Sequence, residues 1–352
     1  MQTQVKFSDF EIIPIMKSVR KEEISDEIYF SNKYSRYISN SRLKYINPAE
    51  EGSPQLFKTP PRLSTTSLVN GSAVHECLLQ PVEFELAPKL GKPTAKLGAV
   101  VEMVYDLRRK GWKLKDAIYE ACNKVSYYVN TIEKKIPTII EKGIKYYVAR
   151  LEYDKKKREK EQIFLSDPDH NTVTGCLKSC YNNQAIMNKL HPTDIFGDPI
   201  ESYCEDALFM DFLVTYKDKH VKLPFKLKID NWTIDEENKV VTLNDLKTSG
   251  KFVGLFMDPT EGSMEHYHYY RQMGAYGSIL WRYLEKTRGV NKNTGWKMDV
   301  NMLVVQTIPP YTSRCFSVNK TQLKRGVDEF EQLMKRVAYY EIFGYKNEVE
   351  FV

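Results

Sequence analysis

Residues 225–248 read FKLKIDNWTIDEENKVVTLNDLKT, two strand-like runs joined by a short acidic turn. The β-branched run VVTL forms the body of the second strand, and residues 235–238 have the composition of a turn. We expect Asp230 to close the first strand, and Asp245 and Lys247 to end the second. Alternate residues of a strand point to the same side, so Asp245 and Lys247 should project from one face. The hairpin therefore predicts two carboxylates and an ammonium close together, an arrangement that suits Mg²⁺ and is costly to bury without a function.

The spacing of these charged residues resembles the signature of the PD-(D/E)XK nucleases. Asp230 is followed fifteen positions later by Asp245-Leu246-Lys247, which matches the D…DXK part of the motif. The residue before Asp230 is Ile229, where the motif has proline; that proline shapes the strand end and supplies no ligand. A surface hairpin with an ion pair at its end is the alternative interpretation of the triad alone.

A second segment, GSAVHECLLQPVEF (71–84), is predicted to begin as a helix with His75 on its apolar face. This segment is similar to the one that precedes the catalytic hairpin in RecE-like (exonuclease VIII) and RecB-type nucleases. The preceding stretch, residues 38–58, resembles the usual opening of that group. The resemblance implies that His75 contributes to the metal site, where a neutral imidazole is a suitable ligand beside carboxylates, particularly for Mn²⁺. On the local pattern alone, His75 is a packed core histidine.

A long aromatic helix is predicted over residues 263–286, with Gln272 and Tyr276 four positions apart on one face. The string YRQMGAYGSILW within it resembles the QxxxY helix that follows the catalytic hairpin in the same nucleases. The resemblance implies that Gln272 and Tyr276 line the DNA-facing side of the site. An aromatic helix buried in the core is the alternative. His266 and His268, near the start of the helix, are expected to face solvent.

Three further elements are predicted from their apolar patterns. Residues 204–216 read as the first strand of the core sheet, residues 299–306 as a strand followed by a turn and a partner strand, and residues 321–344 as an amphipathic helix. Glu205 stands near the start of the first strand. In parts of this superfamily an acidic residue on that strand helps to hold metal, so Glu205 is a candidate third carboxylate, with a surface glutamate as the alternative.

The resemblance implies an α/β fold with a restriction-endonuclease-like core, in which helices flank a mixed central β-sheet. We expect residues 37–352 to form this nuclease domain, after an N-terminal extension of residues 1–36. Residues 92–160 are helical in character, rich in charge and longer than expected between the two motifs, which predicts an inserted helical region.

Two basic clusters in the predicted insertion are candidates for contacts with the DNA backbone. The first, within residues 108–115, includes Arg108, Arg109 and Lys110, and the second covers residues 155–160. Solvated helix faces are the alternative for both clusters.

The composition is that of a globular protein, with 42% hydrophobic and 28% charged residues among 352. The 52 basic and 46 acidic side chains give a net charge of +6, which is compatible with a polyanionic partner without demanding one. No apolar run approaches the roughly 20 residues that span a bilayer, and the first residues lack the pattern of a signal peptide. Six scattered cysteines predict reduced thiols. We therefore expect a cytoplasmic protein, in a bacterium or a phage-infected host, with no membrane partner.

The cysteines also bear on cofactors. Cys176 and Cys180, flanked by His170 and His191, do not have a usual zinc-finger spacing, so we expect no zinc. Iron–sulfur clusters of RecB-type relatives need several cysteines beyond the nuclease motifs. Only Cys315 follows the hairpin, which predicts that no cluster is bound.

Together these resemblances imply a Mg²⁺-dependent DNA exonuclease, with Mn²⁺ able to substitute. Asp230, Asp245, the carbonyl of Leu246 and His75 would hold the metal, and Lys247 would orient the attacking water. Such enzymes commonly digest duplex ends 5′ to 3′, release 5′-phosphate products and leave 3′ single-stranded tails for recombination. They commonly form ring oligomers and work beside a single-strand annealing protein, often in phages. An endonuclease or structure-specific nuclease of the same fold, and a catalytically silent DNA-binding module, are the alternatives. The sequence leaves open the direction of digestion, DNA against RNA, and the oligomeric state.

Overall fold

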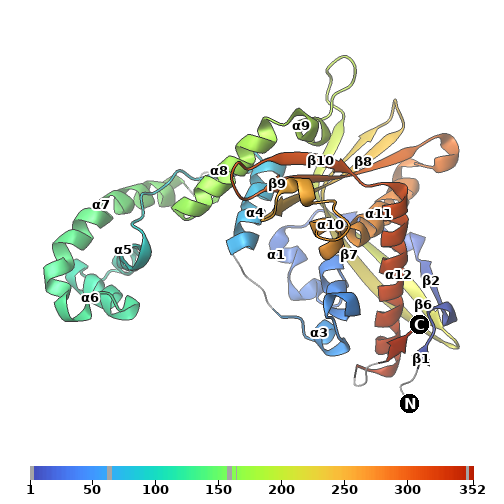
Figure 1. The fold of residues 1–352 in the computed structure, drawn as a ribbon, viewed down its shortest axis with the longest axis horizontal. Helices are drawn as coiled ribbons and strands as arrows, with labels where there is room; N and C mark the ends of the chain where they lie inside the picture. The colour runs from blue at the N-terminus through green and yellow to red at the C-terminus, as the bar shows by residue number, and fades with distance from the viewer. Residues whose placement is uncertain (1–3, 62–65, 157–160, 164, 346–348) are drawn as a thin grey trace. The chain divides into compact units, whose positions relative to one another are not determined.

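The computed structural model describes residues 4–61, 66–156, 161–163, 165–345 and 349–352 (Figure 1). The chain forms two compact units, one made of Met1–Ser67 with Lys178–Val352 and the other of Leu68–Leu177. The first unit contains the central sheet and the candidate site, and the second is mainly helical.

The sheet of the first unit has strand order β10-β9-β8-β7-β6-β2, with β3 also paired to β6. Its strands are β2 (Phe10–Pro14), β3 (Arg20–Glu22), β6 (Glu201–Tyr216), β7 (Lys219–Asp235), β8 (Val240–Ser249), β9 (Lys297–Gln306) and β10 (Ser313–Ser317). Among the described strands of this sheet, β8 and β9 run parallel and the other pairs are antiparallel. The sheet is therefore mixed, and with the helices that flank it the predicted α/β fold class is confirmed.

The hairpin that joins β7 and β8 follows the predicted turn chemistry. The carboxylate of Asp235 accepts from the amide of Asn238 at 2.9 Å, and Lys239 takes a left-handed φ of 54° before β8 begins. The first strand is longer than expected at both ends: β7 begins at Lys219, and after Asp230 it continues to Asp235, paired with both β6 and β8. Asp230 therefore lies inside a strand and does not close it, which corrects the sequence-based prediction.

Two long helices, α11 (Tyr269–Arg288) and α12 (Lys320–Phe343), pack against each other and on the sheet. Figure 1 shows α12 lying across the strands. The helices approach closely at Gly326, where an added Cβ would lie 2.0 Å from the carbonyl oxygen of Tyr270. The single helix predicted over residues 263–286 is interrupted: α10 (Ser263–His266) ends first, and His268 has a left-handed φ of 51° before α11 starts.

Residues 1–36 were expected to be an extension outside the domain, but part of this segment belongs to the sheet. Strand β2 pairs with β6 from Phe10 opposite Tyr216 to Pro14 opposite Phe212, and β3 pairs with the same strand. Tyr29 and Tyr34 pack on Phe209. The other short elements of the first unit are β1 (Gln4–Val5), α1 (Asp26–Tyr29), α2 (Asn40–Leu43), α3 (Pro54–Lys58), α9 (Gln184–Leu190) and β11 (Glu350–Phe351).

The second unit has a hydrophobic core of its own. Helices α5, α6 and α7 contribute buried residues such as Val100, Ile118 and Tyr146 to it. The elements of this part of the chain are α4 (Thr66–Leu79), β4 (Phe84–Leu86), α5 (Ala95–Arg109), α6 (Leu114–Val125), α7 (Ile132–Lys156), β5 (Glu161–Ile163) and α8 (Asp167–Tyr181). The unit contains the segment expected to be an insertion and extends beyond it at both ends.

Candidate active site

The candidate site lies where the pairing of β7 with β8 ends. The last opposed pair is Asn231 with Asn244, so Asp230 and Asp245 would be the next pair in this register. Instead, the backbone amide of Leu246 donates to Oδ2 of Asp230 at 2.8 Å, while β8 continues to pair with β9 as far as Ser249. The side chain of Asp230 thus takes the place of a backbone acceptor, and both aspartates lie at the end of the ladder.

Asp245 is held on both carboxylate oxygens. Its side chain is buried, with the residue 1% exposed, and Oδ1 accepts from Nε2 of Gln272 at 2.5 Å. Oδ2 lies 2.6 Å from Nζ of Lys247. The ammonium of Lys247 also lies 5.2 Å from the centroid of the Tyr269 ring, within the range of a cation–π interaction. The ion pair confirms that Asp245 and Lys247 project from one face of β8.

Charge balance in this cluster separates the roles of its groups. Burial alone would lower the pKa of Lys247, but the carboxylates of Asp245 and Asp230 raise it above its usual value. Burial raises the pKa of Asp230, and Lys247 and the Leu246 amide offset this only in part. Lys247 therefore stays cationic at neutral pH, and its one charge does not fully compensate the carboxylates of the buried Asp245 and the half-buried Asp230.

Glu205 is a third carboxylate in the same cluster. In the β6–β7 register Glu205 would stand opposite Asp230. This pair is missing from the ladder, although the flanking pairs, Cys204 with Asn231 and Asp206 with Ile229, are present. Its φ of 59° is left-handed, which is unusual for a glutamate inside a strand and is a strain that typically marks a functional position. One carboxylate oxygen of Glu205 lies within 4.8 Å of one of Asp230. Glu205 is therefore not an ordinary surface glutamate, since its side chain is only 16% exposed, and its role as a metal ligand stays a prediction.

The electrostatics of Glu205 point the same way. Burial, followed by the negative charge of Asp230, raises the pKa of Glu205 to about 7. The ammonium of Lys228 contacts Glu205 and also Asp26 of α1. Sequence reasoning missed Lys228 and Asp26. Lys228 could have been found, since it stands two positions before Asp230 on the same strand; no sequence signal pointed to Asp26.

Helix α11 presents Gln272 and Tyr276 to this cluster. Gln272 reaches Asp245, as described above, and burial raises the pKa of Tyr276 well above its usual value, with Tyr29, Asp245 and Asp230 adding to the shift. The phenol of Tyr276 is therefore a neutral hydrogen-bond donor at physiological pH. Gln272 and Tyr276 therefore lie beside the hairpin, as predicted. The observed partner of Gln272 is the carboxylate of Asp245, whereas the resemblance implied that Gln272 faces DNA.

The remaining candidate residues belong to the second unit. His75 lies on α4, and Arg108, Arg109 and Lys110 lie at the end of α5 or just after it. Their roles in binding metal or DNA stay predictions. Of the second basic cluster, residues 157–160 lie outside the described part of the chain.

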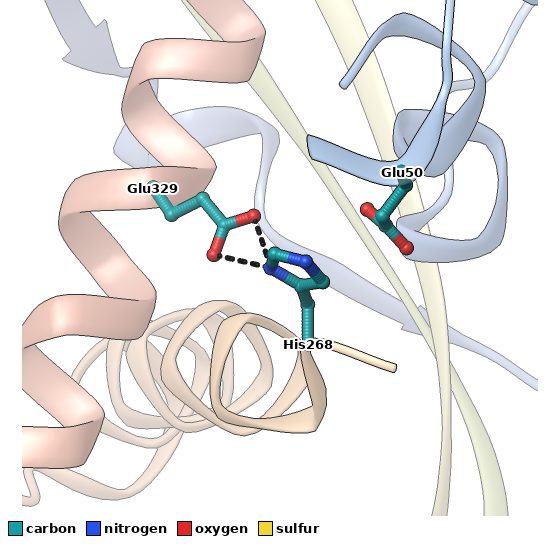
Figure 2. A group of neighbouring side chains, drawn as sticks. All are labelled: Glu50, His268 and Glu329. Carbon is teal, nitrogen blue, oxygen red and sulfur yellow. Dashed lines mark hydrogen bonds and ion pairs between the residues drawn. The ribbon is translucent and has the colours of Figure 1, made fainter. Parts of the chain in front are cut away.

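A second group of metal-ligand type lies in the first unit, formed by Glu50, His268 and Glu329 (Figure 2). One potential ligand atom from each residue lies within 4.8 Å of the others. Nδ1 of His268 is 2.9 Å from Oε1 of Glu329. The expectation that His268 faces solvent is therefore wrong, because its side chain is only 15% exposed and is held against α12.

This group already contains a cation of the protein. Nη1 of Arg271, which is 1% exposed, lies 2.5 Å from Glu50 and 2.9 Å from Glu329. The amide of Asn47 donates to the same two carboxylates, at 2.9 Å each. Both carboxylates are thus neutralised and hydrogen-bonded, and the group is a structural clasp between α11, α12 and the segment before α3.

The comparisons with known proteins add little to this geometry. No protein-family model matches the chain, and no curated protein matches it. A crystal structure from Eubacterium rectale, of a protein provisionally named an exonuclease, is 13% identical with a TM-score of 0.47, covering 93% of this chain and 89% of that one. Protein VC1899 of Vibrio cholerae is 8% identical with a TM-score of 0.14, covering 81% and 59% respectively. Both TM-scores are below 0.5, so neither likeness bears on function.

Among the described residues, no helix is both long enough and apolar enough to cross a membrane.

Proposed function

We propose that this chain is a Mg²⁺-dependent deoxyribonuclease whose site is built on Asp230, Asp245 and Lys247. The observation that carries the proposal is the convergence of the buried Asp245, the half-buried Asp230 and Lys247 at the point where β7 and β8 stop pairing. Buried charges of this kind are costly, and their retention at one place is typical of a site that binds a cation and a charged substrate.

The donor set suits a hard divalent cation. Asp230, Asp245 and Glu205 offer carboxylate oxygens, which Mg²⁺ prefers. Burial raises the pKa of Asp230, and burial together with the charge of Asp230 raises the pKa of Glu205; a bound cation would favour the ionised form of both. The N–H and C=O of one strand residue point to the same side. Since the Leu246 amide meets Asp230, its carbonyl also points toward that side and is a further candidate ligand. His75 is included as a ligand on the resemblance alone.

Bound there, Mg²⁺ would neutralise charge on the scissile phosphate and make a water molecule a better nucleophile. The protein's own groups then have separate tasks. Lys247, kept cationic by its carboxylate neighbours, would hold the attacking water and stabilise negative charge as it develops. Gln272 fixes the orientation of Asp245, and the phenol of Tyr276 is available to donate to a phosphate oxygen.

The finer assignment rests on the family resemblance. We propose that the enzyme is an exonuclease that digests duplex ends 5′ to 3′ and releases 5′-phosphate products. We also propose that it forms a ring-shaped homo-oligomer and works with a single-strand annealing protein. The charged groups at the site are those that phosphodiester hydrolysis requires, and they would serve an endonuclease equally well.

The experiment compares linear duplex DNA, labelled at one 5′ end, with covalently closed circular DNA, both with Mg²⁺. The proposal expects the linear substrate to shorten from its ends, the closed circle to persist, and Asp245→Asn to be inactive. Cutting of the closed circle would show an endonuclease. Binding of DNA without cleavage of either substrate, by a folded wild-type protein with Mg²⁺ or Mn²⁺, would show a silent binding module.

A further inference from the structure

A groove of about 990 Å³ lies beside α11. Met273 and Gly277 of α11 line it, one position after Gln272 and Tyr276, which serve the candidate active site. The start of β9 and the first turns of α12 complete its walls. None of its lining residues belongs to the carboxylate cluster, and nothing in the proposed hydrolysis uses it.

The charge of the groove is strongly biased. Its walls carry two acidic side chains, Glu285 and Asp299, and five basic ones: Arg282, Lys292, Lys297, Lys320 and Lys324. In the described part of the chain, none of these five cations forms an ion pair within 4.0 Å of a carboxylate. An excess of uncompensated positive charge in a concave surface attracts a polyanion.

Arg282 differs from the lysines because it is half-buried. Its guanidinium donates to the carbonyl of Ser278 at 3.0 Å, one turn earlier on α11. Burial lowers the pKa of Arg282, and Glu331 and Glu285 counter this only in part. A partly desolvated guanidinium without a paired carboxylate is well placed to bind phosphate.

Two tryptophans distinguish this groove from a merely basic surface. Trp281 on α11 and Trp296 just before β9 both line it, and both are half-buried. Nζ of Lys292 lies 5.6 Å from the centroid of the Trp281 ring. Indole rings stack on unpaired bases, whereas the bases of a duplex are already stacked on one another, and phosphate contacts alone need no aromatic surface.

From the shape, the charge and the two indoles together, we infer that this groove binds a single-stranded segment of nucleic acid. Bases stack on Trp281 and Trp296, and the flanking cations contact the phosphates. This function is separate from hydrolysis, because it uses no residue of the carboxylate cluster. In a nuclease that acts on duplex ends, such a groove would hold the strand that is not being cut.

The test measures binding of fluorescein-labelled (dT)₂₀ to the full-length protein by anisotropy, in EDTA so that no cleavage occurs. We expect Lys320→Glu/Lys324→Glu to weaken binding by about tenfold or more. The slope of log affinity against log salt should also fall by about 1.4, or about 0.7 for each phosphate of a single strand that the variant leaves unneutralised. The control is Lys6→Glu/Lys217→Glu, which makes the same change of net charge at exposed lysines outside the groove. It should change affinity by no more than about twofold.

Stacking is tested separately with Trp296→Ala, which should weaken (dT)₂₀ binding by about fivefold to a hundredfold, the range for loss of one stacked base. An equal loss in the control pair, or an unchanged affinity in both groove variants, would overturn the inference. The assay is made in EDTA and reads binding without cleavage. The groove can therefore be confirmed even if the proposed nuclease activity is absent, and refuted even if it is present.

Discussion

Nε2 of Gln272 donates to Oδ1 of Asp245 at 2.5 Å, which joins α11 directly to β8 at the candidate metal site. The other oxygen of Asp245 is within 2.6 Å of Lys247, so the carboxylate is fixed from two directions. An acceptor that is oriented before metal or substrate arrives needs little rearrangement on binding. Gln272 is therefore a positioning residue, which acts through Asp245.

The first prediction concerns this hydrogen bond. Gln272→Ala should lower kcat by about 10- to 100-fold, the effect expected from losing one hydrogen bond to a charged group of about 1.5–3 kcal/mol. It should also raise the Mg²⁺ concentration needed for half-maximal rate, because Asp245 loses its fixed orientation. Rates on linear duplex DNA over a Mg²⁺ titration give both values. The control is Gln55→Ala, an exposed glutamine whose bond to the carbonyl of Tyr345 is 3.3 Å. Equal rates for Gln272→Ala and the wild type would remove the positioning role.

Part of this site follows from sequence by simple periodicity. The two-residue repeat of a strand places Asp245 and Lys247 on one face, and the helical repeat places Gln272 and Tyr276 together. The environment of Glu205 could not be predicted in this way. Its left-handed φ is not favoured by glutamate, and it occurs where β6 and β7 lose the opposed pair with Asp230.

The second prediction separates metal binding from chemistry at Lys247. Lys247→Met keeps most of the side-chain length but removes the ammonium that lies 2.6 Å from Asp245. We expect Mg²⁺ to bind at least as tightly as in the wild type, because a competing positive charge is gone, while cleavage falls by a factor of about 100 or more. Calorimetric titration with Mg²⁺ and single-turnover cleavage measure the two effects.

A matched control for this variant is Lys251→Met, just beyond the end of β8. Lys251 donates to the carbonyl of Glu261 at 2.9 Å and is exposed. The Lys251→Met variant should cleave DNA at close to the wild-type rate. Retained cleavage by Lys247→Met, in a protein that is folded by circular dichroism, would contradict the assigned role of Lys247.

The third prediction uses the raised pKa of Glu205. A carboxyl whose pKa rises from 4.5 unfolded to about 7 folded favours folding while it is protonated, and this stabilisation is lost as the pH rises through 7. In EDTA, Glu205→Gln should therefore be more stable than the wild type at pH 8, by on the order of 2 kcal/mol, with little difference at pH 5. Urea unfolding at the two pH values measures this difference.

Two comparisons sharpen the result for Glu205. Adding Mg²⁺ at pH 8 should stabilise the wild type more than Glu205→Gln, because only the wild type offers a third carboxylate. Glu201→Gln, on the same strand, should behave in the opposite way, since the hydrogen bond from Arg288 lowers the pKa of Glu201. A gain of stability for Glu201→Gln equal to that for Glu205→Gln would show that the effect is not specific to the cluster.

Long-range partners are the main feature that the sequence does not reveal. His268 has no local pattern that distinguishes it from a solvent-facing histidine, and its partner Glu329 is sixty-one residues away on another helix. The same holds for strand β2, whose pairing with β6 joins residues about two hundred positions apart. Such contacts depend on how α11, α12 and the sheet pack, and this packing is decided by the whole core.

The fourth prediction concerns the clasp around Arg271. Arg271→Met would leave Glu50 and Glu329 without their buried cation, and should lower the free energy of unfolding at pH 7 by about 3–5 kcal/mol. Arg325→Met is the control, because its pair with Glu265 is exposed, with the arginine side chain 52% accessible, and should cost no more than about 1 kcal/mol. Urea unfolding measures both. Similar losses in the two variants would mean that the clasp does not depend on burial.

The pH dependence of the same variant gives an independent check. Burial alone would raise the pKa of Glu329, but the hydrogen bond from His268 and the charge of Arg271 together lower this pKa below its usual 4.5. The stabilisation is therefore fully present above about pH 5 and is lost as the pH falls through the lowered pKa. In Arg271→Met this shift should shrink or reverse, because a buried carboxylate without a cation is easier to protonate. The gap in stability between wild type and variant should consequently narrow between pH 7 and pH 3, and a gap that stays constant across this range would show that Arg271 acts through packing and not through charge.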